Sequence, residues 1–168
     1  MEKNEGKKEK GIMTVKVNGW ESNLKFSASH FIPFHSKCKR LHGHDYAVDI
    51  KIKGQPENGM IMDFVVIKKV IREILEEMDH RLIVPTKSKD IKYVNQGENL
   101  LIEYEGKTLS IPNEFIYKCE ITHSSSEELS RYICHLILSK VKFPSNVNEI
   151  ELTLYEGPGQ SATWSEGI

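Results

Sequence analysis

The strongest chemical signal in the sequence is a pair of histidines separated by one glycine, His42 and His44. Residues two apart in a β-strand point to the same side, so both imidazoles can reach one point. A neighbouring strand that ends at His30 can bring a third imidazole beside them. Three neutral imidazoles suit Zn²⁺ and leave a fourth coordination position for water or substrate, which is typical of catalytic zinc sites. The alternative is a chance cluster of surface histidines near a turn.

A cysteine, Cys38, precedes this pair in the loop between the two strands. The basic residues around it and a nearby Zn²⁺ would both favour its thiolate form. From the residues alone, three roles fit Cys38: a proton acceptor, a fourth zinc ligand or an inert thiol. The other two cysteines, Cys119 and Cys134, fall in an expected strand and an expected helix and are predicted to be core residues. Three cysteines are an odd number, so reduced thiols are expected.

Carboxylates provide two further candidate sites. Asp79 directly precedes His80 at the end of a predicted helix, and a carboxylate beside an imidazole can fix its tautomer and raise its basicity. The simpler interpretation is a favourable histidine at a helix C-terminus. Glu156 closes a predicted strand just before a Gly-Pro-Gly turn, where it could accept paired N–H donors from a heterocycle. A glutamate at a strand end is otherwise usually a solvated surface group.

The strands that must position these residues are indicated by alternating apolar residues. Alternation over residues 24–30 and again over 46–52 predicts two paired strands on either side of the cysteine loop. Alternation over 150–154, a glycine-rich turn and residues 161–165 predict a second pair.

Two helices are predicted between these strand pairs. Apolar residues recur every three or four positions from Phe64 to Met78, after Asp63 as an N-cap, which is typical of an amphipathic helix. A second amphipathic helix is predicted to start after the three serines at 124–126 and to end before Pro144. The element order is therefore strand, strand, helix, insert, helix, strand, strand.

The insert covers about residues 83–121 and contains short β-like pieces. Residues 95–98 and 105–107 are typical of hairpin turns, so we interpret this stretch as an inserted β-meander. The N-terminal residues mix lysines with glutamates and cannot bury enough apolar surface to become ordered. We expect residues 1–12 to be a flexible tail and residues 13–168 to form a single domain.

The composition is that of an ordinary globular protein with a net charge near zero. The chain has 168 residues, of which 23 are basic and 24 are acidic. No long basic stretch is present, which argues against a general nucleic-acid binder, because phosphate neutralisation needs a concentrated basic surface. No apolar run approaches the ~20 residues of a membrane span, and the polar N-terminus does not resemble a signal peptide. We therefore expect a cytoplasmic protein that binds neither nucleic acid nor a membrane.

Taken together, these residues resemble the family of 6-pyruvoyl-tetrahydropterin and 6-carboxy-tetrahydropterin synthases. The matching segments occur in order over residues 24–156, and their combination is far more specific than any single segment. They are Phe26-Ser27-Ala28-Ser29-His30, Cys38 with three residues before His42-Gly43-His44-Asp45-Tyr46, Gly59-Met60-Ile61-Met62-Asp63-Phe64, Met78-Asp79-His80-Arg81-Leu82, Glu127 at the start of the second helix, and Tyr155-Glu156.

The resemblance implies an α+β architecture, the tunnelling fold. This is an antiparallel four-stranded sheet with two helices on one face, to which this chain adds the inserted β-meander. Members of the family assemble through their sheet edges into trimeric barrels and commonly into homohexamers, which are dimers of trimers with active sites between subunits. Edge pairing would remove strand edges that are otherwise exposed, so we expect the same assembly here.

The resemblance also implies a role for each candidate residue. Cys38 would be the proton acceptor, and Asp79 with His80 would form a proton relay. Glu156 would anchor the pterin ring, with Glu127 as a second carboxylate that binds substrate. The implied Zn²⁺ ligands are His30, His42 and His44.

The substrate that the resemblance implies is 7,8-dihydroneopterin triphosphate. The three-residue gap between Cys38 and His42 resembles the 6-carboxy-tetrahydropterin synthases of the 7-deazaguanine pathway, which leads to queuosine and archaeosine. This predicts a zinc-dependent lyase that forms 6-carboxy-5,6,7,8-tetrahydropterin, acetaldehyde and triphosphate. Basic residues near the cysteine loop are candidates for binding the triphosphate: Lys25, Lys37, Lys39 and Arg40.

Two departures from the family pattern bear on the choice of substrate. The insert is longer than in compact bacterial members, and serines at 124–126 replace a common Pro-Thr before the second helix. The alternatives are therefore a 6-pyruvoyl-tetrahydropterin synthase, which eliminates triphosphate, or a dihydroneopterin aldolase-like enzyme. A third alternative is a pterin-binding zinc protein without turnover. A structural zinc site with Cys38 as its fourth ligand is a further alternative.

Overall fold

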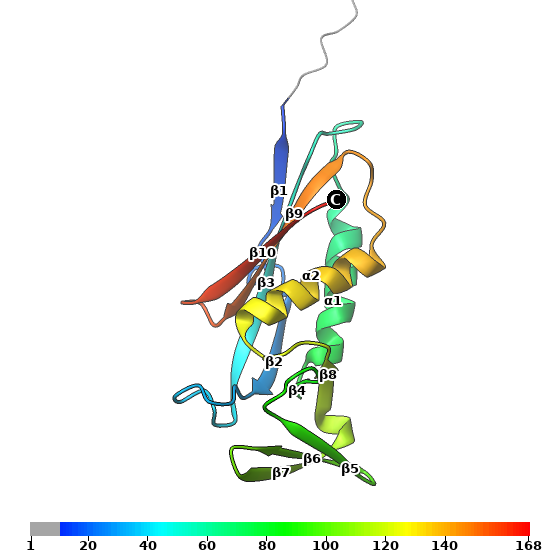
Figure 1. Ribbon diagram of the computed structural model, residues 1–168. Coiled ribbons are helices and arrows are strands. Elements are labelled where there is room, and N and C mark those ends of the chain that lie inside the picture. The colour runs from blue at the N-terminus through cyan, green and yellow to red at the C-terminus, as the bar shows by residue number, and fades with distance from the viewer. Residues whose placement is uncertain (1–10) are drawn as a thin grey trace, which may run out of the picture.

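The longest strand, β3 (His42–Gly54), runs through the middle of a twisted sheet in the computed structural model, which describes residues 11–168 (Figure 1). On one side of β3 lie β1 (Met13–Val17) and β2 (Lys25–His30), which occupy the two halves of a single strand position. On the other side lie β9 (Val147–Glu156) and β10 (Ser161–Gly167). All these pairings are antiparallel, so the predicted sheet is confirmed.

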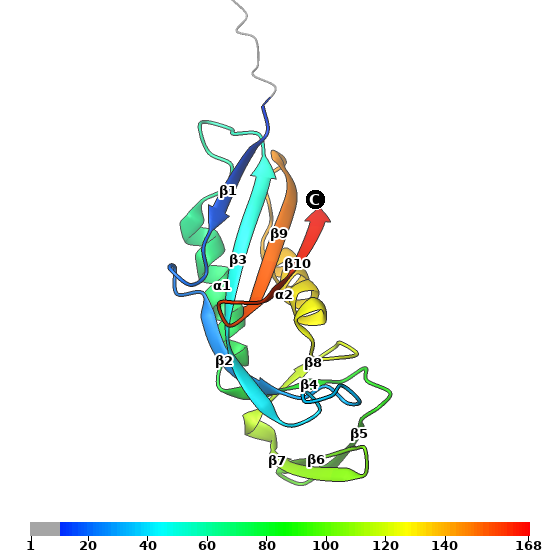
Figure 2. The same ribbon diagram turned by 90° about the vertical axis from the view of Figure 1, so that its left-hand side faces the viewer.

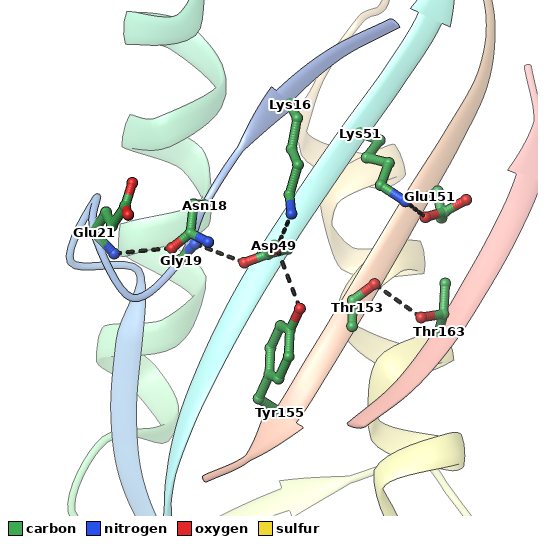
Figure 3. A network of polar contacts seen from close by, with 10 residues as sticks. All are labelled: Lys16, Asn18, Gly19, Glu21, Asp49, Lys51, Glu151, Thr153, Tyr155 and Thr163. Atoms are coloured by element: carbon green, nitrogen blue, oxygen red, sulfur yellow. Dashed lines mark hydrogen bonds and ion pairs between the residues drawn. The ribbon is translucent and has the colours of Figure 1, made fainter. Parts of the chain in front are cut away.

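The sequence did not predict β1. A buried carboxylate holds β1 and the turn that connects it to β2 (Figure 3). Asp49 on β3 is only 2% exposed and accepts a hydrogen bond from the backbone N–H of Gly19 at 2.8 Å. Its second oxygen lies 2.8 Å from Nζ of Lys16, and the Tyr155 hydroxyl donates to it at 3.4 Å. A Cβ at Gly19 would lie 2.4 Å from the Val48 carbonyl oxygen, so only glycine fits this close approach. Asp49 thereby joins β1, β3 and β9.

Two helices cover one face of this sheet, as predicted (Figure 2). They are α1 (Phe64–Met78), capped by the Asp63 side chain, and α2 (Ser126–Lys140), capped by Ser125. In the main core, α1 packs against β2, and α2 packs against β9 and β10. Each fully buried aliphatic side chain there contributes about 1.5–3 kcal/mol. Phe64 begins the helical pattern but is 43% exposed.

The insert between the helices contributes to two different sheets. Strands β4 (Arg81–Pro85) and β8 (Ile116–Cys119) extend the main sheet beyond β2 in parallel pairings. A separate three-stranded antiparallel sheet is made by β5 (Lys92–Gln96), β6 (Asn99–Tyr104) and β7 (Lys107–Pro112), and a short 3-10 helix, η1 (Asn113–Phe115), leads from it to β8.

The meander therefore covers only β5 to β7, which is shorter than the stretch of 83–121 that we interpreted as a meander. A parallel pairing with a distant strand leaves no local signal, whereas the hairpin turns at Gly97 and Gly106 do. A second, smaller core joins this part of the chain to the main sheet and includes Phe31, Leu82, Ile102 and Tyr104.

Residues 1–10 of the predicted tail lie outside the described residues. Within residues 11–168, neither helix has the length and apolar character that crossing a membrane requires.

Candidate functional site

The three histidines that the sequence singled out do converge. His30 pairs with His42 across β2 and β3, and His44 lies two residues further along β3, so all three rings extend from one face of the sheet. One nitrogen from each ring lies within 4.8 Å of the other two. Nε2 of His30 and Nε2 of His42 are 3.1 Å apart. This cluster could hold a metal ion.

The hydrogen bonds behind the rings show that a cation fits there. Nδ1 of His30 donates to the Ser124 carbonyl at 2.6 Å, and Nδ1 of His42 donates to the Arg40 carbonyl at 2.7 Å. In neutral rings these bonds hold the proton on Nδ1 and leave both Nε2 lone pairs facing each other. Two such lone pairs at this distance repel unless a cation lies between them. Imidazole nitrogens bound tetrahedrally to Zn²⁺ are about 3.3 Å apart, close to the separation seen here.

Burial keeps His30 neutral. Its side chain is 1% exposed, and this desolvation lowers the pKa of His30 to about 4, with the neighbouring His42 and His44 acting in the same direction against the Ser124 hydrogen bond. A neutral imidazole at physiological pH is the form that binds a metal ion.

Tyr46 closes the inner end of the cluster, a role that the sequence analysis missed. Its ring stacks on Phe26 with centroids 4.7 Å apart and lies edge-on to His44 at 5.6 Å. The buried Tyr46 hydroxyl has no hydrogen-bond partner among the described residues. Burial, and secondarily the charge of Glu156, raise the pKa of this hydroxyl far above its usual value. The signal was present in the sequence, since Tyr46 continues the two-residue period of the histidines.

Glu156 lies beside this cluster, because β9 pairs it with Tyr46. Burial raises the pKa of Glu156, and the charge of Glu127 in the first turn of α2 adds to this effect. His44 and His42 oppose it, as does a hydrogen bond from Gln160 at 3.3 Å. The two carboxylates that we expected to bind substrate therefore interact electrostatically with each other and, through Glu156, with the histidines.

Cys38 lies in the loop between β2 and β3, partly exposed, and its sulfur is not among the clustered ligand atoms. The Cys38 carbonyl accepts a hydrogen bond from Ile32 at 2.8 Å, which closes the loop. The other thiols, Cys119 and Cys134, are buried as expected, and burial raises the pKa of each to about 12, which makes them inert.

The four candidate cations for triphosphate are not equivalent. Lys25 and His30 are five residues apart on β2, so the Lys25 side chain points to the face of the sheet opposite the histidines. Its Nζ lies over the Trp20 ring, 5.9 Å from the ring centroid. Lys39 is already paired with Glu105 at 3.3 Å. Lys37 and Arg40, on the same loop as Cys38, form no ion pair among the described residues.

The predicted pair of Asp79 and His80 forms at the junction of α1 and β4. Oδ2 of Asp79 lies 2.7 Å from Nδ1 of His80, and Oδ1 accepts a hydrogen bond from the backbone N–H of Ser27 at 2.7 Å. Partial burial raises the pKa of Asp79, but the hydrogen bonds from Ser27 and His80 outweigh it, so the net shift is downward.

This Asp–His pair forms no hydrogen bond or ion pair with the histidine cluster within residues 11–168. The His80 side chain is 81% exposed, and its backbone has φ 56°, a left-handed conformation that is costly for a residue with a side chain. A shallow cavity of about 440 Å³ next to it is lined by Ser27, Ser29, His44, Asp45, His80 and Arg81. The histidine cluster and the Asp–His pair are therefore not bonded to each other within the described residues, although His44 and His80 both line this cavity.

Comparison with known proteins agrees with this arrangement. The family model described as 6-pyruvoyl tetrahydropterin synthase matches residues 20–167. A Methanocaldococcus jannaschii protein, provisionally named 6-carboxy-5,6,7,8-tetrahydropterin synthase, is 35% identical over 156 residues, which cover 90% of this chain and 96% of that protein. The 6-carboxy-5,6,7,8-tetrahydropterin synthase of Haemophilus influenzae is 26% identical over 149 residues, or 84% of this chain and 94% of its own.

Solved structures show the same fold. The 6-pyruvoyltetrahydropterin synthase of Plasmodium vivax superposes with a TM-score of 0.87 at 29% identity, over 94% of this chain and 99% of that one. The Plasmodium falciparum enzyme gives a TM-score of 0.86 at 28% identity with the same coverage. The family-model match, residues 20–167, includes every candidate residue. The chain belongs to the 6-pyruvoyl tetrahydropterin synthase family.

Proposed function

We propose that this protein is a cytoplasmic, zinc-dependent lyase that converts 7,8-dihydroneopterin triphosphate to 6-carboxy-5,6,7,8-tetrahydropterin, acetaldehyde and triphosphate. The product would feed synthesis of 7-deazaguanine nucleosides. Family membership supports a pterin-processing enzyme of the tetrahydropterin-synthase type. The single observation that carries the proposal is the close approach of Nε2 of His30 to Nε2 of His42, 3.1 Å apart, with the third imidazole beside them.

The proposed metal ligands are His30, His42 and His44. A Zn²⁺ ion held there would polarise hydroxyl groups of the substrate side chain and stabilise negative charge that develops on them. Ser124 and Arg40 fix the ring orientations through their carbonyl oxygens, which favours binding at Nε2.

The remaining residues would bind the pterin and move its protons. Glu156, half-buried beside the cluster, would accept N–H donors of the pterin ring, with Glu127 nearby. Cys38 would accept a proton from the substrate side chain. His80, oriented by the hydrogen bond to Asp79, would transfer protons on the opposite side of the substrate. The exclusion of Cys38 from the clustered atoms supports a role as base over a role as fourth ligand.

We further propose that the complete site forms between subunits of a homohexamer. Among the described residues, the His80 side chain is highly exposed, and the side chains of the Asp–His pair bond only to each other and to the Ser27 backbone. A neighbouring copy could bring its own pair to the open side of the histidine cluster. Such an arrangement also accounts for the cost of keeping His80 in a left-handed conformation at the surface.

The 6-carboxy product is favoured over the 6-pyruvoyl product by two observations. Only three residues separate Cys38 from His42, and the Methanocaldococcus jannaschii and Haemophilus influenzae relatives, matched over 96% and 94% of their own length, carry the 6-carboxy name. The 6-pyruvoyl reaction is the second candidate, because the solved relatives from Plasmodium carry that name.

Mass analysis of the product separates these candidates. The purified, zinc-loaded protein is incubated with 7,8-dihydroneopterin triphosphate, and both the pterin and any acetaldehyde are measured. We expect 6-carboxytetrahydropterin with an equal amount of acetaldehyde, and loss of both in Cys38→Ala. A product that retains the full three-carbon side chain would establish the 6-pyruvoyl reaction instead. Equal turnover by Cys38→Ala would remove the proposed role of this thiol.

A further inference from the structure

The loop that carries Cys38 is held in place by the inserted three-stranded sheet. The ring of Phe31, where the loop leaves β2, stacks on Tyr104 at the end of β6, with centroids 4.4 Å apart and planes at 18°. The Tyr104 hydroxyl donates a hydrogen bond to the carbonyl oxygen of Lys39 at 3.0 Å. Lys39 directly follows Cys38. The insert therefore contacts the loop at its base and next to its thiol.

Glu105 makes the most specific of these contacts. One carboxylate oxygen accepts a hydrogen bond from the backbone N–H of Phe34, and the other lies 3.3 Å from Nζ of Lys39. The side chain is 11% exposed although it lies at a hairpin tip. The N–H of Phe34 lowers the pKa of Glu105 most strongly, and Lys39 adds to this against partial burial. The carboxylate is therefore ionised when it binds the loop.

The loop needs such support because part of its backbone is strained. Phe34 has φ 61° and Ser36 has φ 29°, which are conformations that residues other than glycine adopt at a cost. Phe34 is also 69% exposed, so burial of its ring does not pay this cost. The hydrogen bond from its N–H to Glu105 acts at the strained residue itself.

Glu105 lies in the tight turn between β6 and β7, which places its side chain next to the loop. Tyr104 pairs with Lys107 across a two-residue turn, in which Glu105 has φ 47° and Gly106 has φ 69°. Two positive φ values define the hairpin turn that usually contains Asn-Gly or Asp-Gly. A glutamate at this position has a strained backbone conformation, and its side chain contacts Phe34 and Lys39.

We propose that Glu105 and Tyr104 are positioning residues for Cys38, so that the inserted sheet, and not only the site residues of the main sheet, sets the catalytic geometry. This inference rests on the proposed function, in which Cys38 accepts a proton from the substrate. The contacts of Glu105 and Tyr104 with Lys39 also bear on the metal site, because the carbonyl of the next residue, Arg40, orients His42. Proton transfer depends steeply on distance, so a loop displaced by about 1 Å slows the chemical step far more than it weakens substrate binding.

The alternative is that these contacts only stabilise the insert. Three variants distinguish the two. Glu105→Ala removes both contacts to the loop and the 3.8 Å pair with Lys107. Glu105→Gln keeps an acceptor for the Phe34 N–H, and Tyr104→Phe keeps the stack on Phe31 but removes the hydrogen bond to Lys39. Glu103→Ala is the matched control, since Glu103 forms an exposed ion pair with Lys92 at 3.1 Å in the same sheet.

The test measures kcat and KM of each variant, and hydrogen exchange of the backbone amides over residues 32–41. We expect Glu105→Ala to lower kcat by about 10-fold to 100-fold with KM within about twofold, and to speed exchange at Phe34 by at least about 10-fold. Glu105→Gln recovers a substantial part of kcat, Tyr104→Phe loses about threefold to tenfold, and Glu103→Ala matches wild type.

Unchanged kcat in Glu105→Ala and Tyr104→Phe, in a wild-type background that makes product, would overturn the positioning role even if loop exchange increases. An equal loss of kcat in Glu103→Ala would do the same, because the effect would then belong to the insert as a whole. If wild type makes no pterin product, the proposed function fails on its own. In that case, exchange at Phe34 that is unchanged in Glu105→Ala would separately overturn the positioning role. Should Glu105→Ala fail to fold, Tyr104→Phe and Glu105→Gln decide the outcome.

Discussion

Nδ1 of His30, at the end of β2, donates a hydrogen bond to the carbonyl oxygen of Ser124, 2.6 Å away and just before α2. Ser124 is itself fully buried, and its hydroxyl donates to the Phe31 carbonyl at 2.9 Å. This double link joins the start of α2 to the end of β2. It fixes the tautomer of the most buried histidine and directs its Nε2 toward the cluster.

The first prediction concerns metal content. His42→Ala removes one of the three proposed ligands at a partly exposed position, so the fold should survive. We expect bound zinc to fall from about one ion per chain to below about 0.1 after dialysis, because loss of one ligand from three weakens a catalytic site by orders of magnitude. Elemental analysis by mass spectrometry measures this. His135→Ala, which alters an exposed histidine paired with Glu166, is the control and should keep its zinc.

Zinc retention equal to wild type in His42→Ala would show that the imidazoles do not share an ion. Loss of zinc in the His135 control would point to binding elsewhere on the surface.

The helices and hairpin turns could be predicted from the sequence because their signals are local. Asp63 caps α1 and Ser125 caps α2, each a few residues from the positions it stabilises. Strand β1 and the parallel pairing of β4 with β8 could not be predicted in this way, although a strand containing Cys119 was expected. Their pairing partners are distant in sequence, and the anchor of β1 is one buried carboxylate, Asp49, whose partners come from three elements.

The candidate site shows the same division. The spacing of His42 and His44 within one strand predicted their convergence, because strand geometry fixes it. The Ser124 carbonyl, which orients His30, could not be found, since a backbone oxygen carries no sequence signal. The sequence also could not show that Asp79 bonds to Ser27 and not to the cluster, because this depends on where α1 ends relative to β2.

The second prediction tests the left-handed backbone of His80. Glycine is the residue best suited to φ 56°, so His80→Gly should relieve strain, whereas His80→Ala should keep it. We expect the glycine variant to be more stable than the alanine variant by about 1 kcal/mol in urea unfolding. Both should lose about 100-fold or more in kcat, because neither has the imidazole. A glycine variant that is fully active, or less stable than the alanine variant, would contradict this interpretation.

The third prediction concerns stability in acid. The pKa of Asp79 is lower in the folded protein than in the unfolded chain, so its ionised form stabilises the fold. This contribution is fully present above the unfolded value of about 3.9 and is lost as the pH falls through the lower folded value. Asp79→Asn keeps an acceptor for the Ser27 N–H but has no charge. We expect it to be about 1 kcal/mol less stable than wild type at pH 6, with the difference closing as the pH falls through the lowered folded pKa of Asp79.

Urea unfolding between pH 7 and pH 3 measures both curves. A difference that stays constant down to pH 3 would assign the effect to packing and not to charge. Glu103→Gln, at an exposed ion pair, should follow wild type throughout within about 0.5 kcal/mol.

The fourth prediction tests whether sites form between subunits. Cys38→Ala and His80→Ala should each be inactive, but a mixed oligomer would contain interfaces where one chain supplies an intact Cys38 and its neighbour an intact His80. Random mixing at equal amounts gives about a quarter of the sites both groups, so co-expression should restore up to about 25% of wild-type kcat. Asp79→Ala mixed with His80→Ala is the control and should restore nothing, because both changes lie in the same Asp–His pair. If mixed oligomers isolated by two affinity tags stay inactive, the Asp–His pair must act on the cluster of its own chain, and His80 would have to reach it by a movement of β4 against β2.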